Sequence, residues 1–246
     1  MGKRERLDLL LLERQLVESR EEGRRRILAG DVRVNDQAVT KAGAFVELGA
    51  RIHLKPTPRY VSRGGFKLEK ALREFAISVE GKTTLDIGAS TGGFTDCLLA
   101  HGAARVFAVD VGYGQLDWKL RNDPRVVVLE KTNIRYLDRR SLPDDVKLAT
   151  VDASFISLKL ILPCVKALLP ETHEVIALIK PQFEVGKGRV GKGGIVREPE
   201  LHQEVVDTIT GWLAGQPGWS VLGVTDSPIT GADGNREFLI VGRFGG

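Results

Sequence analysis

The sequence LDIGASTGGFT, residues 85–95, decides the fold class, because it is a short apolar strand that runs into a glycine-rich turn. Glycines at such a turn let the backbone approach a ligand at the carboxyl end of a parallel sheet, where open α/β sheets bind nucleotides. A dinucleotide site would follow the spacing GxGxxG, whereas Gly88, Gly92 and Gly93 give GxxxGG, which disfavours an NAD site. The stretch therefore predicts a doubly wound α/β domain that binds a nucleotide-like ligand.

The next strand supplies an acid for the same ligand. Residues 105–110 form an apolar run that ends in Asp110, which follows Gly88 by 22 positions. An acid at this place can accept hydrogen bonds from both hydroxyls of a ribose. Turn and acid together are typical of S-adenosylmethionine sites, and the alternative is a structural turn followed by a solvated aspartate.

Further apolar runs alternate with helical stretches, which indicates a parallel sheet covered on both faces. A helix is predicted over residues 66–75, and strands over 83–87, 105–110, 126–129, 148–152, 175–179, 220–224 and 238–241. The prolines of KPTPR, residues 55–59, mark an extended linker. We therefore expect a first domain over residues 1–55, a linker over 56–61 and a second domain over 62–246.

The excess positive charge lies in the first domain. The 246 residues hold 36 Lys and Arg against 32 Asp and Glu, a net charge of +4, and residues 1–60 alone hold 13 basic and 9 acidic residues. Residues 6–16 have a helical pattern, Ser19 and Glu22 open a second helix, and valines alternate around an Asn35-Asp36 turn. Such a basic α+β module predicts an anionic partner, with a solvated charged face as the alternative.

Several protein classes are excluded by composition. No apolar run approaches the roughly 18 residues of a membrane span, and the N-terminal leucines are too interrupted for a signal peptide. Cys97 and Cys164 have neither disulfide-framework nor metal-site spacing. We therefore expect a cytoplasmic protein without a metal.

A second glycine-rich stretch, GKGRVGKGG at residues 186–194, nearly matches a P-loop. Gly193 stands where a serine or threonine should hold Mg²⁺, so a nucleotide triphosphate site is not expected. We interpret it as a basic loop beside the active site that touches a phosphate backbone, and a plain mobile loop is the alternative.

The motifs taken together resemble the TlyA/haemolysin A family of FtsJ-like ribose 2′-O-methyltransferases, which act on ribosomal RNA. The segment 6–40 is similar to the alpha-L RNA-binding domain of ribosomal proteins. The other shared motifs are SRGGxKL at 62–68, DIGASTGGFT at 86–95, DASFISL at 152–158, KPQFE at 180–184, KGGIVR at 192–197 and GNREF at 234–238.

The resemblance implies a catalytic tetrad of Lys67, Asp152, Lys180 and Glu237. A ribose hydroxyl is a weak acid, so methyl transfer to it needs a base and a fixed line of attack. A buried lysine beside a second ammonium gives up its proton more easily, so we assign the base to Lys180 and the neighbouring ammonium to Lys67. Asp152 and Glu237 are expected to orient the two amines, and no covalent intermediate is required.

The resemblance also implies the cofactor and the partner, S-adenosylmethionine and ribosomal RNA or a ribosomal subunit. The expected cofactor contacts are Asp86, Gly88, Ala89, Ser90, Thr91, Gly92, Gly93, Phe94, Asp110, Asn133 and Asp152. The expected RNA contacts are Arg6, Arg20, Arg24, Arg25, Arg26, Arg63, Lys187, Arg189 and Lys192.

The implied activity is 2′-O-methylation of a cytidine in large-subunit RNA, with small-subunit RNA as a further substrate. The longer members of the family modify both subunits, and this chain, which ends directly after its last predicted strand, resembles the shorter members that act on large-subunit RNA. Three alternatives remain at this point: an NAD-dependent oxidoreductase, a haemolysin-type membrane-lytic protein, and a ribosome-binding factor without catalytic activity. Lysis would require a large exposed apolar face, and the leucines of residues 7–16 are better explained as the core of a small domain.

Overall fold

The computed structural model describes residues 3–56, 59–169, 173–186, 188–231 and 233–245, and the chain divides into two compact units. The first unit is Met1–Pro58 and the second is Arg59–Gly246. The division falls inside the proline-containing stretch 55–59. In these described ranges no helix is long and apolar enough to cross a membrane.

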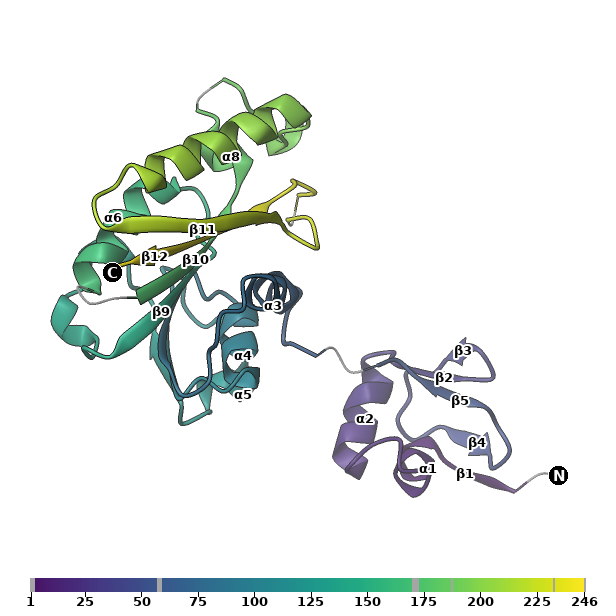
Figure 1. Ribbon diagram of the computed structural model, residues 1–246. Helices are drawn as coiled ribbons and strands as arrows, with labels where there is room; N and C mark the ends of the chain where they lie inside the picture. The colour runs from purple at the N-terminus through teal and green to yellow at the C-terminus, as the bar shows by residue number, and fades with distance from the viewer. Residues whose placement is uncertain (1–2, 57–58, 170–172, 187, 232, 246) are drawn as a thin grey trace. The chain divides into compact units, whose positions relative to one another are not determined.

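The first unit packs two helices against short strands (Figure 1). Its elements are β1 (Arg4–Arg6), α1 (Leu7–Glu13), α2 (Arg20–Leu28), β2 (Val32–Val34), β3 (Gln37–Ala38), β4 (Phe45–Glu47) and β5 (Ile52–Leu54). Strand β1 pairs with β4, and β2 lies between β3 and β5. As predicted, α2 begins after Ser19, whose side chain accepts a hydrogen bond from the Glu22 amide. Buried Leu7, Leu11 and Ile27 bring the helices together over the strands.

The second unit contains a seven-stranded sheet in the order β11-β12-β10-β9-β6-β7-β8. The strands are β6 (Thr83–Ile87), β7 (Arg105–Val109), β8 (Val126–Leu129), β9 (Val146–Val151), β10 (His173–Ile179), β11 (Trp219–Asp226) and β12 (Phe238–Phe244). The predicted strands are all present, with ends that move by a few residues. Since β6 lies at the point where the chain turns from one half of the sheet to the other, its carboxyl end opens a crevice for a ligand.

One strand departs from the all-parallel sheet that the sequence suggested. Strand β12 is antiparallel to both β10 and β11, between which it lies. The connection from β11 to β12, residues 227–237, contains no helix within its described part, so it cannot carry the chain back for a parallel crossover. The sheet is therefore mixed, and β12 begins at the edge where the parallel strands end.

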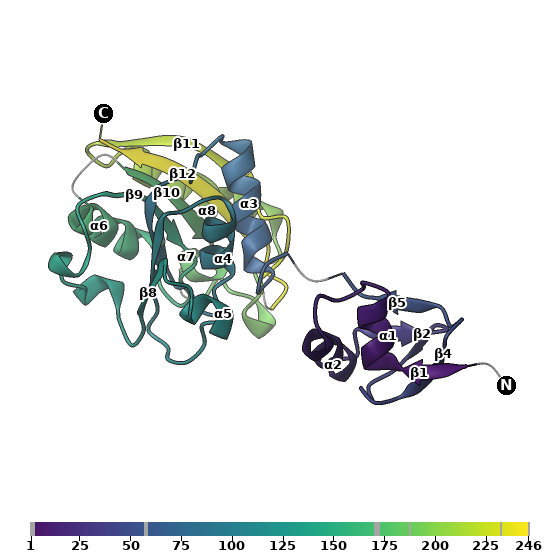
Figure 2. The ribbon, with the colours of Figure 1, turned by 90° about the horizontal axis from the view of Figure 1, so that it is seen from below.

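Helices cover both faces of the sheet, as predicted (Figures 1 and 2). They are α3 (Gly64–Glu74), α4 (Gly93–Ala100), α5 (Trp118–Arg121), α6 (Leu158–Leu168), α7 (Pro181–Glu184) and α8 (Pro199–Ala214), with short 3-10 turns at Ile134–Tyr136, Arg139–Ser141 and Lys192–Gly194. Alternate residues of β10 divide between two cores. Ala177 packs with α6 and α8, whereas Ile176 and Leu178 pack with α3 and α4.

Candidate active site

The glycine-rich turn after β6 is held close to the neighbouring strand. Gly88, Ser90 and Gly92 all have positive φ angles, and a Cβ atom at Gly88 would lie 2.6 Å from the carbonyl oxygen of Asp152. A side chain is therefore excluded at Gly88 by both conformation and space. Asp110 fixes the turn from the other side, because its carboxylate accepts hydrogen bonds from the amides of Ser90 at 2.8 Å and Gly112 at 2.7 Å.

Asp86 differs from the prediction that it contacts the cofactor. Its side chain is fully buried below the turn, where it accepts hydrogen bonds from the hydroxyls of Thr95 at 2.6 Å and Thr150 at 2.9 Å. Burial raises the pKa of Asp86 to about 6, although both hydrogen bonds oppose the rise. Asp86 therefore ties β6 to α4 and β9 and does not line the adjoining cavities.

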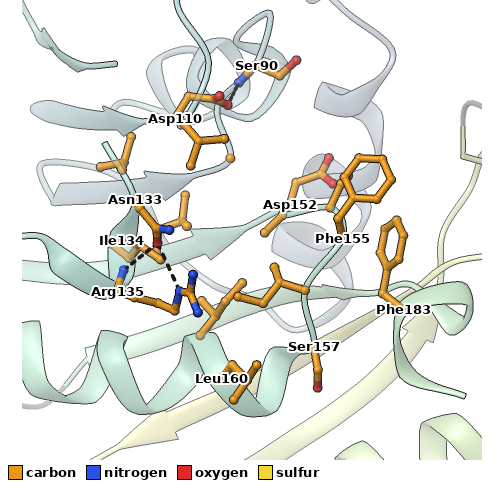
Figure 3. Close-up of a pocket in the computed structure, with 18 of the residues that line it drawn as sticks. Ser90, Asp110, Asn133, Ile134, Arg135, Asp152, Phe155, Ser157, Leu160 and Phe183 are labelled. Carbon is orange, nitrogen blue, oxygen red and sulfur yellow. Dashed lines mark hydrogen bonds between the residues drawn. The ribbon is translucent and has the colours of Figure 1, made fainter. Parts of the chain in front are cut away.

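A cavity of about 980 Å³ opens at the carboxyl ends of β6, β7, β8 and β9. Figure 3 shows Asp110 and Asn133 on one side of it and the rings of Phe155 and Phe183 on the other. Of the predicted cofactor contacts, the residues that line this cavity are Gly88, Ser90, Asp110, Asn133 and Asp152.

The residues of this cavity fit S-adenosylmethionine. Each oxygen of Asp110 accepts one amide hydrogen bond and keeps a lone pair for a ribose hydroxyl. Ile134 and Leu160 add apolar surface suited to a purine ring. The Asn133 carboxamide lies beside them, with its oxygen accepting a hydrogen bond from the Arg135 amide at 3.1 Å.

A second cavity of about 620 Å³ adjoins the first, and the predicted tetrad lines it. Gly88, Ser90 and Asp152 belong to the lining of both cavities. The predicted cofactor residues Ala89, Thr91, Gly93 and Phe94 line the second cavity, whereas Gly92 lines neither. At Gly92 a Cβ atom would lie 2.2 Å from the Leu120 side chain, so this glycine serves the packing of the turn.

The tetrad forms two lysine–carboxylate pairs that meet at Asp152. The Nζ atom of Lys180 donates to Oδ1 of Asp152 at 2.6 Å, and Nζ of Lys67 donates to Oε2 of Glu237 at 2.5 Å. Nζ of Lys67 also lies 4.0 Å from Oδ2 of Asp152. Lys67, Lys180 and Glu237 are buried, so each charge is desolvated and needs its partner. Four residues distant in the sequence are thus brought together as the family motif implied.

Sequence reasoning gave no role to several residues that the structure places at the site. Ser154 accepts a hydrogen bond from Nζ of Lys180 at 2.9 Å, and the rings of Phe155 and Phe183 pack 5.1 Å apart between centroids. Ser154 and Phe155 belong to the motif DASFISL and Phe183 to the motif KPQFE, so the sequence already contained the motifs that mark these residues. The sequence did not show that these two motifs contact each other at the carboxyl ends of β9 and β10.

The predicted RNA contacts of the first unit differ in exposure. Arg24 and Arg25 are exposed on α2, as expected for a binding surface. Arg6 and Arg20 both pair with buried Asp8, at 2.9 Å and 3.0 Å, and remain partly accessible. The hydrogen bond from Arg6 lowers the pKa of Asp8 to about 2, with smaller contributions from the hydrogen bond of Arg20 and from both charges, although burial opposes the shift. These four residues keep guanidinium groups at the surface of the unit.

Arg26 was predicted to bind RNA, and its burial contradicts this. Its side chain is buried, with Nε 3.1 Å from the carboxylate of Asp31, and it donates a hydrogen bond to the carbonyl of Lys55. The buried face of α2 is formed by Gly23, Arg26 and Ile27, so Arg26 points to the inside of the unit whereas Arg24 and Arg25 do not. Arg26 therefore holds α2 to the end of the first unit.

The predicted RNA contacts of the second unit that the structure describes are Arg63, at the second cavity, and Arg189 and Lys192, in the glycine-rich stretch 186–194. Arg63 is exposed and lines the cavity, and Lys192 is exposed on the loop that follows. Arg189 forms a bidentate pair with Glu204 at 2.5 and 2.6 Å. Lys187 lies outside the described residues. Gly186, Val190 and Gly194 of the same loop line the cavities, which places part of this glycine-rich stretch at the site.

No cluster of three or more histidine, cysteine or acidic side chains suitable for a metal ion occurs within the described parts of the chain. Cys97 and Cys164 are free thiols. The polar side chains that line the two cavities are lysines, arginines, carboxylates, hydroxyls and amides.

A nucleotide-type cavity that adjoins a buried set of paired lysines and carboxylates suits the transfer of a group from a cofactor to a hydroxyl. Fold and site define the class as the S-adenosylmethionine-dependent methyltransferases. A solved structure of a candidate enzyme of this class from Listeria monocytogenes superposes with a TM-score of 0.55 at 17% identity, over 75% of this chain and all of that one, which shows the fold alone.

The family follows from closer matches. The model of the FtsJ-like methyltransferases matches residues 60–244, and that of the S4 domain matches residues 5–52. The chain belongs to the TlyA group of the FtsJ-like methyltransferase family. YqxC of Bacillus subtilis, a candidate rRNA methyltransferase, is 51% identical over 97% of this chain and 85% of its own length.

Two other relatives carry more specific names. The 16S/23S rRNA (cytidine-2′-O)-methyltransferase TlyA of Mycobacterium tuberculosis is 46% identical over 98% of this chain and 90% of its own length. Hemolysin A of Brachyspira hyodysenteriae is 44% identical over 95% of this chain and 98% of its own. A solved structure from Streptococcus thermophilus, of a protein named for hemolysin, superposes with a TM-score of 0.73 at 46% identity, over 100% of this chain and 90% of that one.

Proposed function

We propose that this protein methylates the 2′-hydroxyl of a cytidine ribose in ribosomal RNA of the large subunit, and also of the small subunit, with S-adenosylmethionine as methyl donor. The observation that carries the proposal is the tetrad of Lys67, Asp152, Lys180 and Glu237 beside a cavity that fits the cofactor. The name of the M. tuberculosis relative supports the choice of cytidine and of both subunits.

The bound cofactor supplies an electrophilic methyl group on its sulfonium. The residues of this chain bind the cofactor and place the ribose of the RNA beside it. Gly88, Asp110 and Asn133 hold the cofactor in the first cavity, while Asp152 stands at the junction with the second. A ribose placed in the second cavity then lies beside the Nζ atoms of Lys67 and Lys180.

Lys180 is the proposed base. It acts as the neutral amine: two N–H bonds are donated to Asp152 and Ser154, the lone pair of Nζ takes the proton of the 2′-hydroxyl, and the ammonium that forms returns this proton to solvent after methyl transfer. Asp152 and Ser154 both hold this nitrogen, at 2.6 Å and 2.9 Å, so its remaining direction is fixed toward the cavity. Glu237 holds Lys67, whose ammonium stabilises the negative charge that develops on the ribose oxygen.

The first unit is proposed to hold the ribosomal RNA or an assembled subunit. Exposed Arg24 and Arg25, together with Arg6 and Arg20 on buried Asp8, present positive charge on an S4 domain. Contacts with phosphates release counterions and make binding dependent on salt. This unit supplies affinity, whereas the second unit supplies the chemistry.

The experiment is transfer of a labelled methyl group from S-adenosylmethionine to isolated ribosomal subunits, with the position mapped by mass spectrometry. Label on the ribose of a cytidine is expected. Lys180→Ala should abolish transfer and leave cofactor affinity nearly unchanged. Lys166→Ala replaces a half-buried lysine on α6 that donates to the Pro217 carbonyl and lines neither cavity, so it should behave as wild type. Absence of label on both subunits, or label on a base, would contradict the proposal.

A further inference from the structure

The loop 153–157 separates the two cavities and carries residues that face both. Ser154 and Phe155 line the first cavity and the second. Phe155 is 90% exposed and has a φ angle of +64°, a left-handed conformation that is strained for a residue with a side chain. A strained and exposed loop of this kind keeps one shape only if contacts from elsewhere hold it.

Those contacts come from a single segment, residues 180–184, which holds both ends of the loop. At the first end, Nζ of Lys180 donates to Oγ of Ser154 at 2.9 Å. At the second end, the carboxylate of Glu184 accepts hydrogen bonds from the Ser157 hydroxyl at 2.6 Å and the Leu158 amide at 2.7 Å. Between them the ring of Phe183 packs against that of Phe155.

Glu184 forms these two hydrogen bonds from a partly buried position, which disfavours the charged form of its carboxyl group. Burial raises the pKa of Glu184, while the hydrogen bonds from Ser157 and Leu158 and the charge of Lys159 oppose the rise. The carboxylate lies at the start of α6, where the first amides of the helix lack partners within it. A carboxylate from another segment thus fixes the point where the loop ends and α6 begins.

We propose that Glu184 is a positioning residue for methyl transfer, which braces the loop 153–157 so that Ser154 meets Lys180 between the two cavities. This inference rests on the proposed function. Glu184 acts through the loop, because its carboxylate contacts Ser157 and Leu158 and lines neither cavity. Loss of the brace should therefore impair the transfer step more than it impairs binding.

The test compares steady-state kinetics of Glu184→Ala and Glu184→Gln on ribosomal subunits. Glu184→Ala removes both hydrogen bonds, and kcat should fall about 10- to 100-fold, since small misplacements of reacting groups cost this much, while KM for RNA changes far less. Glu184→Gln keeps an acceptor for the Leu158 amide and can donate to the Ser157 hydroxyl, so it should restore most of kcat.

A double-mutant cycle separates positioning from general destabilisation. Ser154→Ala and Glu184→Ala should be non-additive in log kcat, because both release the same loop. Glu174→Ala is the matched control, since Glu174 also accepts from two partners, Lys82 and Arg243, but at the opposite end of β10. That variant should lower thermal stability and leave kcat unchanged. If Glu184→Ala does not fold, Ser157→Ala carries the test with a smaller loss of kcat.

Wild-type kcat in Glu184→Ala would overturn the proposal. A loss of kcat in Glu184→Gln as large as in Glu184→Ala would also overturn it, because the effect would then come from the charge and not from the hydrogen bonds that hold the loop. Additive effects of Ser154→Ala and Glu184→Ala would overturn it as well. Each of these results presupposes that the wild-type protein methylates the subunit. If the proposed function is wrong, the wild-type protein itself transfers no methyl group, and this result is distinct from any difference between the variants.

Discussion

Replacement of Asp86 by asparagine should make the stability of the second unit less dependent on pH. Asp86 is fully buried below the glycine-rich turn, with the hydroxyls of Thr95 and Thr150 as its partners. Asparagine has nearly the same shape and can accept from one hydroxyl and donate to the other. The substitution therefore removes a buried charge and retains the packing.

The sign and size of the effect follow from the pKa of Asp86, which burial raises from 3.8 to about 6. Because the pKa is higher in the folded state, the native protein holds the proton more tightly, so this stabilising contribution is present below pH 3.8 and is lost as the pH rises through about 6. The full difference corresponds to about 3 kcal/mol, and about 2 kcal/mol of it falls between pH 4 and pH 7.

Urea unfolding followed by tryptophan fluorescence can measure this difference. The three tryptophans, Trp118, Trp212 and Trp219, all belong to the second unit, so the signal reports on that unit alone. Between pH 4 and pH 7 the free energy of unfolding of the wild type should fall by about 2 kcal/mol relative to Asp86→Asn. An equal difference between the two proteins at both pH values would refute the reasoning, since Asp86 would then not titrate in this range.

A matched variant tests the cause of the shift. Thr150→Val removes a hydrogen bond that opposes the raised pKa of Asp86. In that variant the pKa of Asp86 should rise further, and the stability should fall over a wider pH interval than in the wild type. An unchanged interval would mean that the Thr150 hydroxyl does not stabilise the carboxylate.

Three further predictions concern binding and catalysis. Arg24→Ser with Arg25→Ser should weaken RNA binding and reduce the slope of log K against log salt by up to about 2, whereas Arg26→Ala should lower the melting temperature of the first unit. Gly88→Ala places a Cβ atom 2.6 Å from a carbonyl oxygen, so calorimetry should show cofactor affinity reduced by more than about tenfold, a loss of more than 1.4 kcal/mol. Glu237→Gln leaves Lys67 without its carboxylate, and single-turnover assays should show a rate lower by about 10- to 100-fold at saturating cofactor.

The sheet could be predicted well because buried strands have a distinct apolar pattern. The predicted ranges 83–87 and 126–129 agree with β6 and β8, and the others differ only at their ends. The direction of β12 could not be predicted from its own residues, because a strand buried on both faces has the same composition in either direction. Its direction depends on the length and structure of the preceding connection.

The tetrad could be predicted because the motifs that contain its four residues resemble those of the FtsJ-like family. The four tetrad residues are brought into two ion pairs, as the motifs implied. Asp86 was assigned to the cofactor because an acid in a glycine-rich motif looks like a ligand, and its threonine partners come from α4 and β9. Arg26 likewise appears basic and available in sequence, and only the helix geometry directs it toward Asp31.

The place of β12 in the sheet has a consequence for synthesis of the protein. During translation β11 is made before β12, yet in the sheet β12 lies between β11 and β10. Strand β11 consequently has no neighbour to pair with until residues 238–244 have left the ribosome. Glu237 stands directly before these residues, so a nascent chain that stops short of them has neither a closed sheet edge nor the carboxylate that holds Lys67. The sheet edge and the Lys67–Glu237 pair are therefore both completed by the last strand of the chain and the residue before it.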